Sequence, residues 1–307
     1  MPDTPLRGIF APVTTPLRGD SLDLDAFARN LRHYATTPLS GVVVLGSNGE
    51  AALLADDEAD ALIARAREAF PTSKWLIAGT GRESTGAAIA ATKRAAERGA
   101  DAVMVRTPSF YKNRMSPDAL AAYYRAVADA SPVPVILYNV TIFTGVNLLP
   151  ETAAALSAHP NIVGIKDSGG DVAVISDLVA GCRPGFAVLA GSTTSLYPSL
   201  CVGAWGAVVG PAACAPEVCA GVQAAFGRGD HDEARRLQAA LVPISKSVGA
   251  RWSVAGLKAA VDAAGLSGGP PRPPLLPVPA EGMRTIEQQV KELARLAGTM
   301  QPAAGRS

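Results

Sequence analysis

Two reactive side chains, an amine and a phenol, end neighbouring apolar segments of this 307-residue chain. Lys166 closes the β-branched run 162–165, and Tyr138 closes the run 133–137. A buried lysine is rare unless it is paired or carries out chemistry, and apolar surroundings favour its uncharged, nucleophilic amine. We therefore expect Lys166 to act as a Schiff-base nucleophile and Tyr138 to shuttle protons beside it. The alternatives are a structural ion pair for the lysine and an aromatic lid for the tyrosine.

A polar turn, Gly46-Ser47-Asn48-Gly49-Glu50, follows another apolar run. Ser47 and Asn48 precede a predicted helix, where free backbone N–H groups and the helix dipole favour an anion. The same side chains could instead cap that helix, and both roles can coexist. An amine, a phenol and an anion cradle suit a 2-oxo acid, whose ketone condenses with the lysine. The resulting iminium then serves as an electron sink for cleavage or formation of a carbon–carbon bond.

The remaining titratable residues favour no other chemistry. His33, His159 and His231 fall in a helix, at a strand entry and in the C-terminal region, so a histidine-bound metal and a Ser-His-Asp triad are not expected. Among the other lysines, Lys112 is expected to reach the catalytic face, on a polar loop where water keeps it protonated. The lysines expected away from that face are Lys74, Lys93, Lys246, Lys258 and Lys291.

Strand-like and helix-like segments alternate through the first 227 residues. The expected strands are 8–14, 41–45, 75–78, 102–105, 133–138, 162–166, 186–190 and 207–209. Eight such β/α units predict a (β/α)8 TIM barrel of the α/β class, spanning 1–227, with its active site at the carboxyl ends of the strands. Residues 228–307 are expected to form a C-terminal helical appendage. Its predicted helices are 231–248, 254–264 and 281–296, and its proline-rich connector is 268–279.

The composition of the chain limits the classes of molecule that it is expected to bind. The formal net charge is +1 without a basic block, so neither nucleic acid nor an anionic membrane is an expected partner. Hydrophobic residues make up 48% of the chain, but Gly, Pro, Ser and Thr interrupt its charge-free stretch 184–216, so no membrane span is predicted. We expect no signal peptide, four buried reduced cysteines and a cytoplasmic location. The cysteines are Cys182, Cys201, Cys214 and Cys219.

Three ordered motifs resemble those of the dihydrodipicolinate synthase and N-acetylneuraminate lyase superfamily of class I aldolases. They are Gly41–Glu50, Leu137–Val140 and Gly164–Ser168, and the similarity extends from about Gly8 to Gly269. Within the superfamily the chain is most similar to 4-hydroxy-2-oxoglutarate aldolase. The segments that carry this closer similarity are Gly46–Glu50, Glu83–Thr85, Asn161–Asp171 and Val188–Gly191.

The resemblance implies a role for each matching residue. Lys166 would form the Schiff base and Tyr138 would transfer protons. The implied substrate contacts are Ser47, Asn48, Ser168 and Gly191. The implied reaction is reversible cleavage of 4-hydroxy-2-oxoglutarate to pyruvate and glyoxylate, without a metal or organic cofactor. The implied assembly is a homotetramer made of two tight dimers.

The chain departs from the family pattern at several positions. Phe143 stands where true dihydrodipicolinate synthases have an arginine for the second substrate's carboxylate. This argues against lysine biosynthesis, counts against a dicarboxylate substrate and suggests an apolar acceptor. Phe110, with Tyr111 beside it, replaces a tyrosine that a neighbouring subunit inserts, so these two are candidate relay or lid residues. Phe143 and Val208 are assigned as specificity residues. Ser192-Thr193 replaces the acidic pair of sialic acid lyases.

These departures keep several functions open. The leading one is a pyruvate-type aldolase acting on a 2-oxo acid and an aldehyde. Its enzymatic alternatives are dihydrodipicolinate synthase, a lyase or dehydratase for a keto-deoxy sugar acid, and an aldolase joining pyruvate to an aromatic aldehyde. A barrel that binds an oxo acid without turnover is the alternative from another class.

Overall fold

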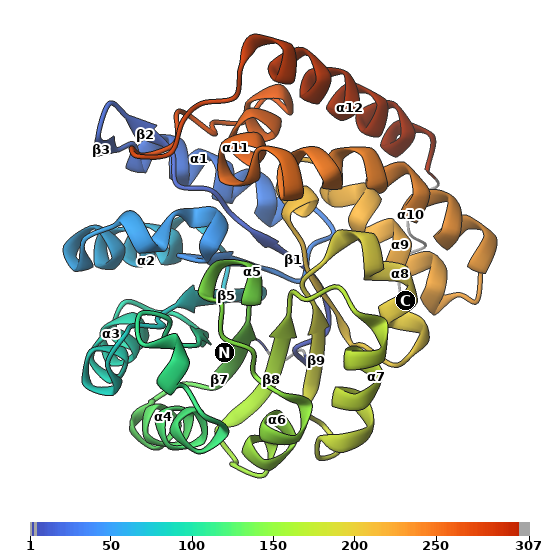
Figure 1. Cartoon of the computed structure of the whole chain (residues 1–307). Coiled ribbons are helices and arrows are strands. Elements are labelled where there is room, and N and C mark those ends of the chain that lie inside the picture. The colour runs from blue at the N-terminus through green and yellow to red at the C-terminus, as the bar shows by residue number, and fades with distance from the viewer. Residues whose placement is uncertain (1, 3–4, 301–307) are drawn as a thin grey trace.

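The computed structural model describes Pro2 and residues 5–300, and its centre is a closed barrel of eight parallel strands (Figure 1). The strands are β1 (Gly8–Pro12), β4 (Gly41–Val44), β5 (Trp75–Gly79), β6 (Ala102–Arg106), β7 (Val135–Asn139), β8 (Ile162–Asp167), β9 (Ala187–Ala190) and β10 (Gly206–Val208). They pair in chain order, and β10 closes the ring against β1. The predicted TIM barrel is therefore confirmed, and each predicted strand has a counterpart.

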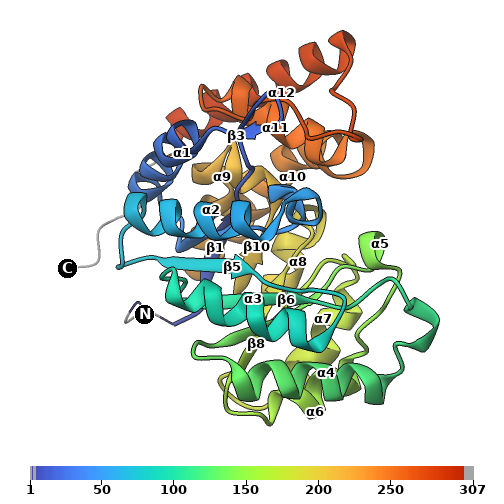
Figure 2. The same cartoon turned by 90° about the vertical axis from the view of Figure 1, so that its left-hand side faces the viewer.

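Helices surround the barrel and bury the outer faces of its strands. They are α1 (Leu24–Thr36), α2 (Asp56–Ala69), α3 (Thr85–Glu97), α4 (Pro117–Ala130), α6 (Pro150–Ser157), α7 (Val172–Gly181), α8 (Leu196–Cys201) and α9 (Pro216–Gly227). Ser84 and Ser116 begin α3 and α4, and each hydroxyl accepts a hydrogen bond from a backbone N–H of the first turn. The short helix α5 (Thr141–Thr144) follows β7 and lies at the carboxyl end of the barrel (Figure 2).

Two apolar clusters explain why the strands carry continuous hydrophobic runs. One lies between strands and helices, and the other fills the barrel itself with side chains such as Phe10, Val43, Ile77 and Leu189. A parallel strand in a barrel is buried on both faces, so its sequence does not alternate. The cysteine prediction was partly wrong, because Cys214 and Cys219 are buried whereas Cys201 is exposed and Cys182 half-buried.

A small hairpin between β1 and α1 was not predicted. Its strands β2 (Leu17–Arg18) and β3 (Ser21–Leu22) pair antiparallel around Gly19, whose φ of 62° is left-handed. Strands of two residues are too short to produce a hydrophobic period in a sequence.

The C-terminal region forms α10 (His231–Ser245), α11 (Ser253–Ala263) and α12 (Ala280–Thr299), which pack together along the α1 and α9 side of the barrel (Figure 1). The predicted helix 231–248 ends early, because a π-helical turn, Lys246–Arg251, replaces its last part. No helix in the described part of the chain has the length and apolar character needed to cross a membrane. The division into 1–227 and 228–307 stays a proposal.

Candidate active site at the carboxyl end of the barrel

Lys166 and Tyr138 lie side by side in the barrel wall. β8 places Lys166 in register with Tyr138 of β7, and the Nζ atom lies 4.2 Å from the centroid of the phenol ring. Only 4% of the Lys166 residue surface is exposed. Within residues 5–300, no carboxylate lies in ion-pair range of this lysine. The geometry therefore lacks the partner that a structural ion pair would need.

The Tyr138 hydroxyl faces three polar groups. Its oxygen lies 3.3 Å from the Ser47 hydroxyl oxygen, and either atom can donate. Burial pushes the pKa of Tyr138 upward, but the positive charge of Lys166 and hydrogen bonding to Ser47, Lys166 and Ser168 outweigh it and lower that pKa. A phenol with a lowered pKa exchanges its proton more readily near neutral pH.

The residues after the lysine and the tyrosine hold the neighbouring loops in place. Asn139 donates from Nδ2 to Asp167 Oδ2 at 2.7 Å and to Asn147 Oδ1 at 2.8 Å, and its Oδ1 accepts the Leu148 N–H at 3.0 Å. Asp167 also accepts the Gly169 N–H at 2.9 Å. Successive strand residues point to opposite faces. The carboxylate of Asp167 therefore points away from Lys166 and bonds to this network, and it does not pair with the lysine. Sequence reasoning missed these supporting roles.

The Ser47-Asn48 turn differs from the prediction. It forms a 3-10 turn, η1 (Ser47–Gly49), between the left-handed residues Leu45 (φ 56°) and Glu50 (φ 57°). A second 3-10 turn follows, and α2 begins only at Asp56, so the prediction that Ser47 and Asn48 lead directly into that helix was wrong. The first N–H groups of a 3-10 turn still lack acceptors within the turn itself. They remain suitable for a carboxylate, but the helix-capping alternative is excluded.

A second buried lysine, Lys258, holds this turn in place. Lys258, fully buried on α11, donates from Nζ to Glu50 Oε2 at 2.6 Å and to the Thr15 carbonyl oxygen at 2.8 Å. Thr15 donates its hydroxyl to the Gly49 carbonyl oxygen at 2.7 Å. Burial lowers the pKa of Lys258, while Glu50 opposes that shift. The expectation that Lys258 lies away from the catalytic face was therefore wrong.

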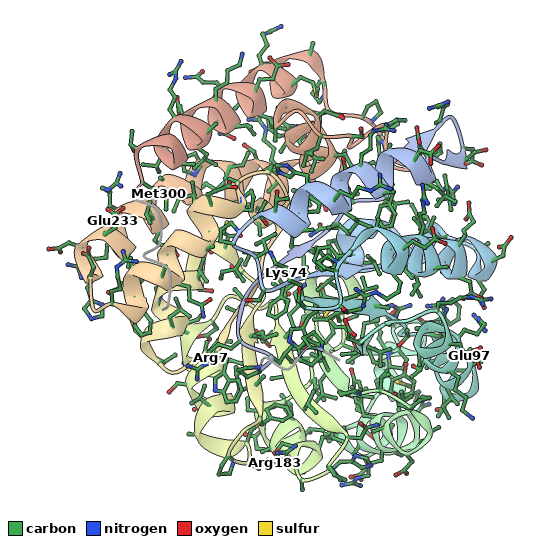
Figure 3. All side chains as sticks on the ribbon, turned by 180° about the vertical axis from the view of Figure 1, so that it is seen from behind. Arg7, Lys74, Glu97, Arg183, Glu233 and Met300 are labelled. Carbon is green, nitrogen blue, oxygen red and sulfur yellow. The ribbon has the colours of Figure 1, made fainter. Side chains whose placement is uncertain are left out.

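Lys74, by contrast, lies where it was expected. It precedes β5 at the opposite end of the barrel, where Figure 3 labels it from behind, and its Nζ donates to the Thr37 carbonyl oxygen.

Ser168 and Gly191 adjoin the lysine at the ends of β8 and β9. The Gly191 N–H donates to the Asp167 carbonyl oxygen at 2.6 Å, and the Ser168 N–H donates to the Asn139 carbonyl oxygen at 2.9 Å. A Cβ atom at position 191 would come within 2.1 Å of the Ser168 hydroxyl oxygen. Gly191 thus leaves room for that hydroxyl at the end of the barrel.

The other predicted site residues lie nearer the mouth of the barrel or beneath it. Phe110 (77% exposed) and Tyr111 (70%) stack edge to face at 5.0 Å on the loop after β6, and Phe143 (55%) lies on α5. Phe110 and Phe143 line the cavity of the site. Val208 is buried in the inner barrel cluster with Tyr138 and is not part of the cavity wall.

A cavity of about 950 Å³ opens above these residues. Ser47 and Tyr138 contribute to its polar floor, and residues of the C-terminal region, including Trp252 and Leu276, complete its wall. This volume is at the upper end of the range for small-molecule sites. The described part of the chain brings no three His, Cys, Asp or Glu side chains together as a metal-binding group. The site can therefore offer an amine, a phenol, hydroxyls and backbone amides.

Comparison with known proteins gives consistent matches over nearly the whole chain. The profile of the Dihydrodipicolinate synthetase family matches residues 5–293. A 4-hydroxy-tetrahydrodipicolinate synthase of Exiguobacterium sp. is 36% identical over 274 residues, which cover 89% of this chain and 93% of the relative.

Two solved structures have the same fold. The dihydrodipicolinate synthase of Bacillus anthracis superposes with a TM-score of 0.89 at 31% identity, covering 95% of this chain and 99% of that one. A prophage protein of the dihydrodipicolinic acid synthase family from E. coli K12, solved in complex with pyruvate, superposes with a TM-score of 0.88 at 27% identity. The superposition covers 94% of this chain and 99% of the prophage protein.

Proposed function

The chain belongs to the dihydrodipicolinate synthetase family, whose members are metal-independent class I lyases of the aldolase type. We therefore propose that Lys166 is its Schiff-base residue and that pyruvate is the donor or product of its reaction. The predicted superfamily is thereby confirmed, whereas the closer similarity to 4-hydroxy-2-oxoglutarate aldolase stays a prediction. The observation that carries the proposal is a buried amine beside a phenol of lowered pKa, without a carboxylate partner among the described residues.

The proposed first step joins Lys166 to the 2-oxo acid. The uncharged amine attacks the ketone carbon and forms a carbinolamine, which loses water to give the protonated Schiff base. Tyr138 supplies and removes the protons, since its hydroxyl faces both Lys166 and Ser47. The substrate carboxylate binds the N–H groups of the Ser47-Asn48 turn, and Ser168 and Gly191 complete the contacts.

For the second step we propose cleavage of 4-hydroxy-2-oxoglutarate. Tyr138 removes the proton of the C4 hydroxyl, the C3–C4 bond breaks, and its electron pair moves into the iminium. Glyoxylate leaves, and an enamine of pyruvate remains on Lys166. Protonation of that enamine at C3 and addition of water release pyruvate and restore the amine. The reverse sequence condenses pyruvate with glyoxylate.

The second candidate is dihydrodipicolinate synthase activity, with aspartate semialdehyde as acceptor. The name of the 36%-identical relative favours it. Phe143 in the cavity wall is exposed and uncharged, so it cannot itself bind the carboxylate of an acceptor, whether aspartate semialdehyde or glyoxylate.

Borohydride trapping tests the shared mechanism. Wild-type protein incubated with pyruvate and borohydride should gain the mass of one reduced pyruvate, and Lys166→Ala should gain none. Lys74→Ala is the matched control, because Lys74 lies at the opposite end of the barrel. An undiminished adduct on Lys166→Ala, or no adduct on wild type, would disprove the proposal. Rates with glyoxylate, aspartate semialdehyde, aromatic aldehydes and N-acetylmannosamine would then separate the candidate reactions.

We also propose a cytoplasmic homotetramer, a dimer of dimers. Large apolar side chains that remain exposed indicate contact surfaces, and Phe110, Tyr111, Ile142 and Phe143 form such a set on the two loops that follow β6 and β7. All four cysteines are free, which is compatible with a reducing compartment. Light scattering should give four times the chain mass of 31.4 kDa, and a single-chain mass would contradict the tetramer.

A further inference from the structure

Three cationic side chains line the cavity within the described residues: Arg82, Arg106 and Lys112. Lys166 lies beside Tyr138 of the cavity wall and is not itself a lining residue. Arg82 pairs with Asp56 at 2.8 Å, and Arg106 pairs with Glu83 at 2.8 Å. Lys112 has no carboxylate in ion-pair range anywhere in residues 5–300. Its positive charge is therefore the one of these three that remains available to a ligand.

The Glu83 carboxylate explains why Arg106 is not available. Burial pushes the pKa of Glu83 upward, but the N–H groups of Phe110 and Ser109, together with Arg106, outweigh it and lower that pKa to about 2. Both N–H groups donate to Glu83 Oε2 at 2.8 Å. Glu83 thus stays ionised, neutralises Arg106 and fixes the start of the loop that carries Lys112.

Lys112 begins the short turn η3 (Lys112–Arg114), and its side chain lies close to Gly145 at the end of α5. A Cβ atom at Gly145, which ends α5, would lie 3.4 Å from Lys112 Cδ and 3.9 Å from Nζ. The ammonium group therefore lies against the turn that carries Phe143. Lys112 and Phe143 both line the cavity that Tyr138 and Ser47 also line.

We propose that Lys112 binds the carboxylate of the second substrate, so that the enzyme accepts an aldehyde that is itself an acid. The proposal rests on the pyruvate aldolase function above, in which the Ser47-Asn48 turn already holds the first carboxylate. A condensation product with two carboxylates presents a second anion, and a charge-assisted hydrogen bond from an ammonium group can hold it. Phe143 beside it packs against the carbon chain. The ligand class is a short 4-hydroxy-2-oxo dicarboxylic acid.

The test measures condensation of pyruvate with glyoxylate and with acetaldehyde, which has no carboxylate. Lys112→Met, which keeps the length of the side chain, should raise the KM for glyoxylate about 10- to 100-fold, the effect of losing one charged hydrogen bond. Its rate with acetaldehyde and its pyruvate adduct after borohydride should match wild type. Lys112→Arg keeps a charged donor for the carboxylate, so it should keep the KM for glyoxylate within about threefold of the wild-type value.

Arg114→Met is the matched control, because Arg114 is an exposed cation of the same turn outside the cavity wall. An unchanged KM for glyoxylate in Lys112→Met, with trapping intact, overturns the role of Lys112 and leaves the aldolase proposal standing. An equal loss in Arg114→Met also overturns it, because the effect would then be a general one of surface charge. Absence of a pyruvate adduct on wild type would instead refute the aldolase proposal, and the role of Lys112 with it.

Discussion

Two buried lysines of this chain differ in their surroundings. Lys258 has a carboxylate at 2.6 Å and a carbonyl oxygen at 2.8 Å, so its charge is compensated inside the protein. Lys166 has the face of an aromatic ring at 4.2 Å and no carboxylate in range among the described residues. An ammonium group without a counter-ion is costly to bury. This difference in partners makes Lys166, and not Lys258, suited to covalent chemistry.

At this scale the first prediction concerns Tyr138. Tyr138→Phe removes the proton-transfer group but keeps the ring beside Lys166. It should lower kcat by about 10²- to 10⁴-fold, while the pyruvate adduct still forms on long incubation with borohydride. Tyr197 lies outside the cavity wall and contacts His231, so Tyr197→Phe should leave kcat unchanged. An equal loss in Tyr111→Phe would instead indicate a relay through that exposed tyrosine.

The pH dependence of wild type provides a second measurement of the same role. The pKa of Tyr138 is lowered from its ordinary value of 10.0. As the pH rises through that lowered pKa, the phenol loses the proton it must donate. The activity should therefore fall on the alkaline side below pH 10, and a profile that stays flat to pH 10 would contradict the assignment.

Sequence patterns located these residues because strand ends can be recognised from apolar runs. Lys166 and Tyr138 follow such runs directly, and both occupy the predicted end of the barrel. Lys258 was missed because its partner Glu50 is 208 positions away, a separation that no local pattern spans. The prediction placed Ser47 directly before α2, because the left-handed conformation of Leu45 and Glu50 cannot be recognised in the sequence. Neither residue is a glycine, the usual sign of that conformation, and tertiary contacts set it instead.

At the scale of elements, α11 and the Ser47-Asn48 turn form one unit. Glu50 accepts from Lys258 on α11 and from the Arg272 N–H at 2.6 Å in the connector to α12. Thr15 at the end of β1 joins the same network through Lys258 and Gly49. The C-terminal region thereby fixes the conformation of the turn that would hold the substrate carboxylate.

The second prediction follows from this unit. Lys258→Met leaves Glu50 buried without its counter-ion and should lower the free energy of unfolding by about 3–5 kcal/mol. Glu50→Gln/Lys258→Met should recover part of that loss, because the amide needs no counter-ion. Both variants should raise the KM for pyruvate more than they lower kcat. Urea titrations and initial rates provide the measurements.

The control for this cycle is Lys93→Met, because Lys93 is exposed on α3. The cycle is completed by the single variant Glu50→Gln. If the losses of Glu50→Gln and Lys258→Met simply add in the double variant, Glu50 and Lys258 do not depend on each other, and the link between α11 and the site is removed.

For the whole molecule, the alternation of strands and helices was sufficient to predict the barrel, since β/α repeats leave few topologies. The packing of the last three helices was not predictable, because it depends on contacts between distant segments. The Asn30 side chain in α1 donates to the Ser267 carbonyl oxygen at 2.7 Å, and Gln238 in α10 donates to the Thr193 carbonyl oxygen at 2.9 Å. Arg272 pairs with Glu58 in α2 at 2.6 Å.

These contacts lead to the last prediction, that the barrel 1–227 and the helices 228–307 unfold together. The chain has three tryptophans, of which Trp75 lies on β5 and Trp252 precedes α11. A Trp205→Phe/Trp252→Phe variant then reports on the barrel, and a Trp75→Phe/Trp205→Phe variant reports on the C-terminal region. Each fluorescence midpoint in urea should coincide with the far-ultraviolet circular dichroism midpoint of the same variant, because the transition is cooperative. An earlier Trp252 transition would instead indicate that the appendage is an independent domain, and that the Ser47-Asn48 turn can lose its contacts with Lys258 and Arg272 while the barrel stays folded.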